Sequence, residues 1–259
     1  MQSSLNSVSV IAGKSFALTR LLMLAASIVL PGISGCENLG SMVMEDQEVI
    51  REKQLEPYHT IWTYGLFDIT LVQDSVHKVV ISGRKGQVNN IHFSQHNRRI
   101  RVTEKSTNHW YSGMGKPQLE FHFKEMRYVR LEEPSTLTSQ DTLHGKHLKL
   151  IVANELSGID LQINTNSLYL ENWTTNTGRF KIAGQCDDLR VQLTGSARLE
   201  AGNLHTREAF IRQESIGDVY IHTKDTLEVH SFARGHVYYY GNPEEIIFEN
   251  SSSGELIGL

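Results

Sequence analysis

The chain has 259 residues, a formal net charge of −4 and only two cysteines. A mildly acidic chain lacks the basic field that phosphate backbones require, so nucleic acid is not expected as a partner. Two cysteines are too few for a scaffold held together by disulfides, so a buried core must stabilise the fold.

Residues 1–35 are predicted to be a signal peptide that is not part of the fold. Lys14 and Arg20 precede an apolar run from Leu21 to Leu30. This run is too short to cross a bilayer, which needs roughly 20 apolar residues, but it has the length of a secretory h-region.

The sequence Ile33-Ser34-Gly35-Cys36, which follows the apolar run, resembles a bacterial lipobox. The resemblance implies lipidation of the Cys36 thiol, cleavage before this residue and acylation of the new N-terminus. Acyl chains contribute about 0.8 kcal/mol per buried methylene, so they would anchor the protein without a transmembrane helix. The alternative is an ordinary cleavable signal peptide with a coincidental cysteine. We expect a protein anchored at Cys36 in the bacterial cell envelope, on the periplasmic face or the outer surface.

Residues 36–57 are expected to be the acylated cysteine and a polar tether that ends at Pro57, the alternative being a short amphipathic helix. Residues 58–259 form the domain. Within it, residues 58–125 show the period-two alternation of strands, as in Leu119-x-Phe121-x-Phe123, interrupted by turn residues. We expect an irregular, antiparallel β segment at this N-terminal end.

Residues 126–259 contain a repeat in which each copy opens with two apolar residues separated by one position. The openings are Leu148-x-Leu150, Leu168-x-Leu170, Leu189-x-Val191, Ala209-x-Ile211, Leu227-x-Val229 and Ile246-x-Phe248. A constant period of this length is typical of stacked units that cover each other's apolar faces. The chain is therefore predicted to be all-β, a single-stranded parallel β-helix with rungs of 18–21 residues. A β-sandwich of similar period is the alternative.

A glycine follows the opening in most copies. These glycines are Gly158, Gly178, Gly217, Gly235 and Gly254. We expect each one to mark a corner that needs a positive φ or a tight bend. The last copy, residues 251–259, carries no capping helix in its sequence. It is predicted to be either covered by neighbouring loops or an edge that pairs with another chain.

A resemblance to a known family rests on five segments. They are Tyr58–Val72, Val79–Gly83, Ile100–Val102, the sequence GHVYYYGNP from Gly235 to Pro243, and Ser251–Leu256. These segments resemble the head GIN domain family, a β-helical family with an adhesin label and no assigned molecular function. The resemblance covers 58–259 and implies a secreted or lipid-anchored domain with no catalytic residues to carry over. The chain departs from the family's Ser-Gly corner pairs at Thr177-Gly178, Ile216-Gly217 and Arg234-Gly235.

The polar residues show no pattern of a catalytic or metal site. The twelve histidines include no pair with ligand spacing, and the acids are spread over different copies. Cys186 is interpreted as a half-buried filler of the scaffold rather than as a nucleophile. We therefore expect no metal, no cofactor and no catalytic residue.

Aromatic side chains are the candidates for a surface that binds a ligand. The candidates are Trp110, Tyr111, Trp173 and Tyr239, with Tyr238 and Tyr240 expected to pack into the core. The predicted function is a non-catalytic, lipid-anchored envelope protein that binds a glycan or an envelope protein, as an adhesin does. One alternative is a polysaccharide lyase or hydrolase. The other is a structural lipoprotein that assembles through its C-terminal edge.

Overall fold

The structure is a computed structural model that describes residues 47–105, 115–173 and 175–259. In these ranges the chain is nearly all β, with one short helix, α2 (Lys85–Asn89). The strands are β1 (Glu48–Gln54), β2 (Thr60–Tyr64), β3 (Asp68–Gln73), β4 (Lys78–Arg84), β5 (Ile91–His96), β6 (Arg99–Glu104), β7 (Gln118–Phe123), β8 (Tyr128–Leu131), β9 (Thr136–Ser139), β10 (Leu143–Val152), β11 (Gly158–Asn172), β12 (Arg179–Gly195), β13 (Arg198–Ser215), β14 (Val219–Ser231), β15 (Val237–Tyr240), β16 (Glu245–Asn250) and β17 (Leu256–Gly258).

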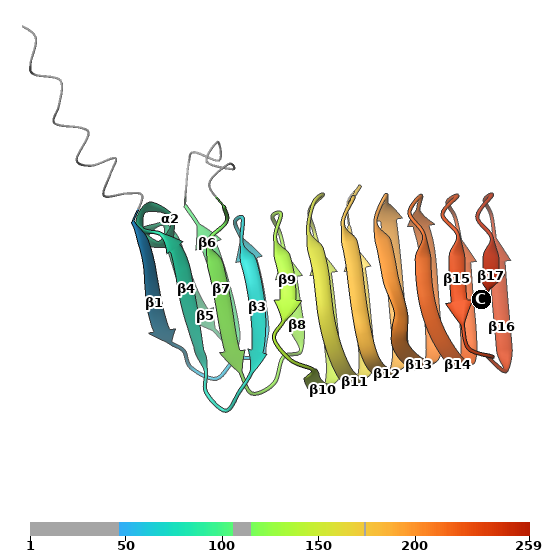
Figure 1. The fold of residues 1–259 in the computed structure, drawn as a ribbon, viewed down its shortest axis with the longest axis horizontal. Coiled ribbons are helices and arrows are strands. Elements are labelled where there is room, and N and C mark those ends of the chain that lie inside the picture. The colour runs from blue at the N-terminus through green and yellow to red at the C-terminus, as the bar shows by residue number, and fades with distance from the viewer. Residues whose placement is uncertain (1–46, 106–114, 174) are drawn as a thin grey trace, which may run out of the picture. The chain divides into compact units, whose positions relative to one another are not determined.

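The strands form a β-solenoid with two outer faces. Face 1 contains, in stacking order, β1, β4, β7, β3, β9, the first parts of β11 to β14, β15 and β17. Face 2 contains β5, β6, β2, β8, β10, the second parts of β11 to β14, and β16. Figure 1 shows these strands side by side along the stack. The apolar side chains between the two faces form one continuous core.

The predicted repeat is confirmed strand by strand. Leu148 pairs with Leu168, and the same line continues through Leu189, Ala209, Leu227 and Ile246, always between parallel strands. Alternate side chains of a strand point to opposite sides, so this register places the apolar openings of successive rungs directly over one another in the core. The all-β, parallel solenoid predicted from the period is the observed fold.

The N-terminal strands enter the stack out of sequence order. Strand β2 lies between β6 and β8, and β3 lies between β7 and β9, all in parallel pairs. The segment that contains β2 and β3 is therefore inserted between strands that come later in the sequence. The antiparallel arrangement expected for 58–125 is limited to the pairs β1–β4, β4–β7 and β5–β6 at that end of the stack.

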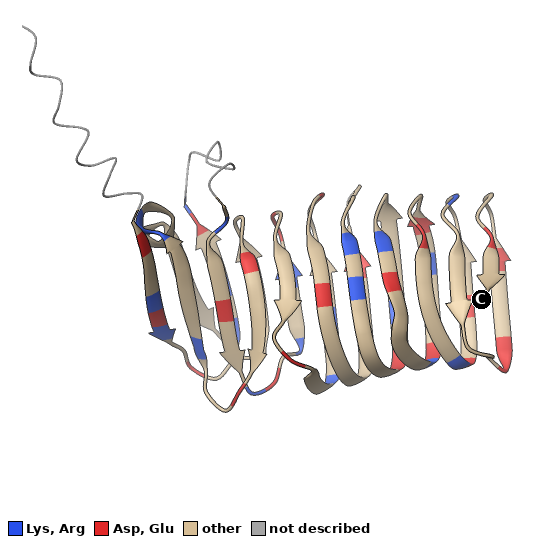
Figure 2. Ribbon diagram, in the orientation of Figure 1, with Lys and Arg blue, Asp and Glu red and all other residues tan. Residues whose placement is uncertain are grey.

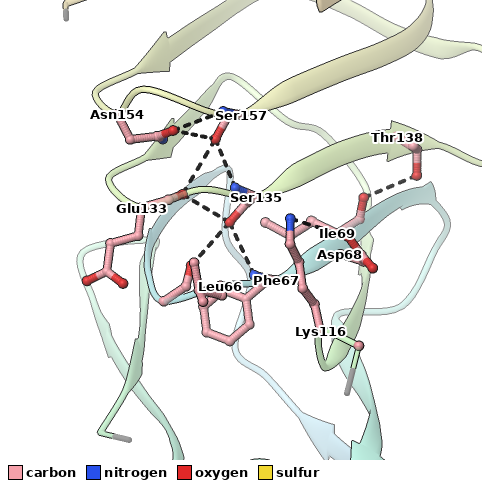
Figure 3. A network of polar contacts seen from close by, with 12 residues as sticks. Leu66, Phe67, Asp68, Ile69, Lys116, Glu133, Ser135, Thr138, Asn154 and Ser157 are labelled. Carbon is pink, nitrogen blue, oxygen red and sulfur yellow. Dashed lines mark hydrogen bonds and ion pairs between the residues drawn. The ribbon is translucent and has the colours of Figure 1, made fainter. Parts of the chain in front are cut away.

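A buried hydrogen-bond network fastens the inserted segment to its neighbours (Figure 3). The Ser135 hydroxyl donates to the carbonyl of Gly65 at 3.2 Å and accepts from the Phe67 amide at 3.3 Å. The hydroxyl of Ser157, in the next rung, accepts from the Ser135 amide at 2.9 Å and donates to Asn154. Corners of three successive rungs are thus joined by side chains that are closed off from water.

Strand β1 occupies residues expected to belong to the tether. It pairs antiparallel with β4 along its whole length, while most of its side chains are exposed. Val49 and Leu55 pack against the core, which gives this segment an apolar anchor on the solenoid. The tether interpretation of 36–57 did not anticipate this strand.

The corner glycines are required by close approach rather than by backbone dihedral angle. The φ angles of Gly178, Gly217 and Gly235 are not positive, but a methyl group on any of them would overlap a carbonyl oxygen of the preceding rung. All five corner glycines lack a positive φ, whereas Gly184, Gly195 and Gly241 in the same region have one, at 114°, 75° and 94°. Of the two reasons predicted for the corners, the positive φ is therefore wrong for the corner glycines.

The departures from the Ser-Gly pairs also have a structural reason. The residue directly before Gly178, Gly217 and Gly235 is exposed, as Thr177, Ile216 and Arg234 show, while Ser157 before Gly158 is buried. At Gly217 the side-chain hydrogen bonds of the corner are made by Ser215, two positions before the glycine. The Ser215 hydroxyl accepts from the Gly217 amide at 3.0 Å and donates to the Ala197 carbonyl at 2.7 Å. The residue directly before the glycine is therefore free to vary.

Candidate binding surface

The four aromatic candidates have different surroundings. Trp110 and Tyr111, like Cys36, lie outside the described residues. Trp173 follows β11 on face 2 and is 50% exposed, with its indole N–H donating to Glu171 Oε1 at 2.6 Å. Of the candidates that the structure describes, Trp173 is the one that presents an aromatic ring to solvent.

Tyr239 points to the opposite side from the one expected. It packs against the core from β15, while Tyr238 and Tyr240 point outward. Tyr238 stacks on Tyr220 with ring centroids 4.7 Å apart, and Tyr240 is 38% exposed. The predicted core packing of Tyr238 and Tyr240 is therefore wrong, because Val237 is the buried residue that sets the phase of this strand.

A cluster that the sequence did not single out lies on face 2, where β6 and β2 pair. In β2, Ile61 and Thr63 point into the core, so Trp62 and Tyr64 point outward. In β6, Ile100 and Val102 are buried, so the alternating arginines Arg99 and Arg101 point outward on the same face. The parallel pairing of these two strands brings two arginines onto two aromatic rings.

Each of these arginines stacks on a ring. The guanidinium of Arg99 lies 4.0 Å from the centre of the Trp62 ring, and that of Arg101 lies 4.1 Å from the centre of Tyr64. Both arginines are exposed, so the stacked guanidinium groups face solvent with their other side. A cation over an aromatic face contributes roughly 0.5–1 kcal/mol at such exposed sites.

The cluster continues through β8 and the end of β11. Arg130 lies 4.1 Å from the Trp173 ring centre and 5.6 Å from that of Trp62, and its Nε donates to Glu132 at 2.6 Å. Further along, the Lys149 ammonium lies 4.4 Å from the centre of Tyr169. We call this set the arginine strip. Its cations are Arg99, Arg101, Arg130 and Lys149, and its rings are Trp62, Tyr64, Tyr169 and Trp173.

Three of the four cations of the strip have no carboxylate partner among the residues that the structure describes. In the part of the chain that the structure describes, Arg99, Arg101 and Lys149 form no ion pair. Arg130 pairs with Glu132. Because the chain as a whole is acidic, a local excess of unpaired positive charge is a specific feature of this part of face 2.

Face 1 has a different character (Figure 2). Its strands carry charges of both signs, and the Lys181 ammonium lies 3.1 Å from Asp160 on the neighbouring strand. Arg179 pairs with Glu200 on the next strand. These exposed pairs neutralise one another, so face 1 offers a mixed polar surface rather than a charged one.

The described residues contain no group of three His, Cys, Asp or Glu side chains that could hold a metal ion. Cys186 is buried with its thiol donating to the Asp188 carbonyl at 3.1 Å, and burial raises the pKa of this thiol to about 11. A thiol in this state is a poor nucleophile.

The stacked rungs and their glycine corners define a β-solenoid protein. The family described as "Putative auto-transporter adhesin, head GIN domain" matches residues 57–243, which is more than half of the chain. The chain therefore belongs to the head GIN domain family, and the resemblance found in the sequence is confirmed. No curated protein matches the sequence.

Solved structures share the fold at low sequence identity. A "putative adhesin" from Bacteroides fragilis matches with a TM-score of 0.77 and 14% identity, over 83% of this chain and 99% of its own. A "putative adhesin" from Parabacteroides merdae matches with a TM-score of 0.61 and 14% identity, over 82% and 96%. A "putative lipid binding protein" from Parabacteroides distasonis has a TM-score of 0.58 and 12% identity, over 82% and 96%. At these identities the likeness concerns the fold alone.

No helix among the described residues is long and apolar enough to cross a membrane.

Proposed function

We propose that the protein is a non-catalytic, lipid-anchored adhesin of the bacterial cell envelope that binds its ligand through the arginine strip of face 2. The observation that carries the binding role is the set of exposed, ring-stacked cations without carboxylate partners, described above for Arg99 and Arg101. The adhesin description of the family and of its solved relatives supports the same role.

The stacked arginines fit a binding surface because they are ordered before the ligand arrives. An exposed arginine usually loses side-chain entropy when it binds, at a cost of about 0.5–1.5 kcal/mol per immobilised side chain. A guanidinium that already lies on a ring has lost part of that freedom. Arginine, tyrosine and tryptophan are also the residues that contribute most at protein interfaces.

Lipid anchoring is supported by the lipobox-like Ile33–Cys36. The test is labelling of cells that express the full chain with a radioactive fatty acid, comparing the natural sequence with Cys36→Ser. The natural chain is expected to incorporate label and to remain with the membrane fraction, and Cys36→Ser to do neither. Equal labelling of both chains would exclude an anchor at Cys36.

The binding role is tested with the full lipidated protein in a neutral detergent, screened on arrays of glycans and of envelope proteins. Binding that the double variant Arg99→Gln/Arg101→Gln weakens supports the proposal. Release of a product from any polysaccharide on the array would establish the enzyme alternative instead.

A second role is supported by the exposed apolar side chains of β16. Ile246, Ile247 and Phe248 are 45%, 39% and 38% exposed, and β16 pairs with β14 alone among the described strands. Ile246 and Phe248 continue the core lines of Leu227 and Val229. An apolar strand edge of this kind pairs readily with another strand. If the chain assembles through it, Phe248→Lys will shift the full-length protein to a smaller species in analytical ultracentrifugation.

A further inference from the structure

We infer that the ligand of the arginine strip is an acidic polysaccharide, a linear glycan with carboxylate or sulfate groups at regular intervals. This inference rests on the binding function proposed above and adds the chemical class of the ligand to it.

The exposed chemistry of the strip favours oxyanions. A ring covers one face of the Arg99 and Arg101 guanidinium groups, at 4.0 and 4.1 Å, so the N–H edge and the other face remain available. A planar guanidinium donates two parallel hydrogen bonds to a carboxylate or a sulfate, and such charge-assisted bonds are the stronger ones. Since these two arginines form no ion pair in the described chain, an incoming anion displaces no protein carboxylate from them.

The order of the groups along the stack favours a linear polymer over a single small anion. Trp62 is in register with Arg101 on one side and with Arg130 on the other. Neighbouring strands lie about 4.8 Å apart, so the backbone positions of Arg101 and Arg130 are separated by about 9.6 Å, with that of Trp62 between them. The spacing is close to the length of one disaccharide unit.

A second row repeats this order. Tyr169 is in register with Lys149 on one side and with Arg190 on the other, which again separates the backbone positions of two cations by two strands, about 9.6 Å. Arg190 pairs with Asp188 at 3.3 Å, as Arg130 pairs with Glu132 at 2.6 Å. The two parallel rows of cation, ring and cation form a track rather than a pocket, and a track matches a chain of sugars whose acid groups recur.

The rings would contact the sugar faces between the acid groups. Trp173 is half exposed, and Tyr169, four residues before it, is partly exposed. Aromatic faces pack against the apolar faces of sugar rings, while the polar edge of the indole is already held by Glu171 at 2.6 Å. Glu132 and Glu171 are the acids within the strip, and each is engaged with Arg130 or Trp173.

The test uses the full-length protein in a neutral detergent and four immobilised polymers. Two are acidic, polygalacturonate with carboxylates and heparin with sulfates, and two are neutral, dextran and amylose. We expect binding to at least one acidic polymer, no binding to the neutral ones, and an affinity that falls as salt is added because the charges are screened.

Three variants locate the site. Arg99→Gln/Arg101→Gln is expected to lower the affinity by about tenfold or more, the effect of losing central interface residues. Arg99→Lys keeps the charge but not the planar stack, so its loss is expected to be smaller. Arg198→Gln is the matched control, because Arg198 is an exposed arginine without a described ion pair on face 1, and it is expected to bind like the natural protein. Equal melting temperatures will show that each variant is folded.

The outcomes separate the inference from the proposed function. The arrays could instead identify a protein or a neutral glycan as the ligand, with its binding lost in Arg99→Gln/Arg101→Gln. That result would support the proposed binding function but contradict the inference that the ligand is an acidic polysaccharide. Binding to anionic phosphatidylglycerol vesicles but to neither acidic polymer would overturn it as well, in favour of a membrane surface. If the double variant changes no binding at all, both the inference and the proposed binding surface are wrong.

Discussion

Gly217 lies against the carbonyl oxygen of Ala197, the equivalent corner of the preceding rung, so closely that a methyl group on Gly217 would overlap this oxygen. The same contact recurs between Gly235 and Gly217. The corners therefore stack backbone on backbone, which is why a residue without a side chain recurs there. Gly158 is an exception, since a methyl group on it would be 3.7 Å from the nearest atom, the carbonyl oxygen of Arg179.

This difference gives a matched pair of substitutions. Gly217→Ala is expected to destabilise the domain by about 1–3 kcal/mol, the usual cost of forcing an extra carbon into a packed site. For a domain of this size that lowers the melting temperature by roughly 3–10 °C. Gly158→Ala is the control and is expected to melt within about 2 °C of the natural protein, because its methyl group meets only ordinary contacts. Circular dichroism melting of both variants is the measurement, and equal melting would contradict the close-approach account.

The network at Ser135 gives a second stability prediction. In Ser135→Ala the buried Phe67 amide and Gly65 carbonyl lose their partner, so we expect a loss of about 1–3 kcal/mol, the cost of an unsatisfied buried group. Ser196→Ala is the control, since Ser196 is exposed and no side-chain bond of it is described. Urea unfolding compares the two. A midpoint shift in Ser135→Ala no larger than that in Ser196→Ala would show that the network does not hold the inserted segment.

The repeat was readable from the sequence because its signal is local. Leu148, Leu168 and Leu189 each open an apolar pair at nearly the same interval, and in-register stacking of equal units is the arrangement that buries all of them in one core. The position of β2 and β3 carries no such signal. The alternation of apolar and polar residues in β2 and β3 is compatible with pairing to any neighbouring strand. The hydrogen bonds that fix their position, such as that from Ser135 to Gly65, join residues seventy positions apart.

The arginine strip could not be predicted from the sequence for the same reason. Trp62 and Tyr64 alternate in one segment, Arg99 and Arg101 alternate in another, and only the pairing of β2 with β6 brings them together. The error at Tyr239 is of another kind. Three consecutive tyrosines give no hydrophobic alternation, so they do not indicate which side chains of β15 point into the core. The neighbouring Val237 decides this, because its side chain is buried in the core.

Cys186 is predicted to be unreactive in the folded protein. Burial is the main cause of its raised pKa of about 11, so near the ordinary thiol pKa of 8.5 it remains protonated as well as shielded. In the Cys36→Ser chain, where it is the single cysteine, a thiol reagent should label it slowly until guanidinium chloride unfolds the protein. Cys36→Ser/Ser196→Cys is the control with one exposed thiol, which should react at once. Equally fast labelling of the native Cys36→Ser chain would show that Cys186 is accessible.

His222 is predicted to titrate at a lower pH than an ordinary histidine. Burial is the main cause of its lowered pKa, and the neighbouring His205, whose ring centre lies 4.3 Å away, adds to it. Since the unfolded chain binds this proton more readily, the group leaves stability unchanged well above pH 6.5 and reduces it as the pH falls below that value. In His205→Ala the pKa of His222 should rise towards 6.5, and the loss of stability in acid should shrink. NMR titration of the imidazole protons measures the pKa, with His96→Ala, an exposed histidine on β5, as the control. A His222 pKa that does not move in His205→Ala would show that the two rings are not coupled.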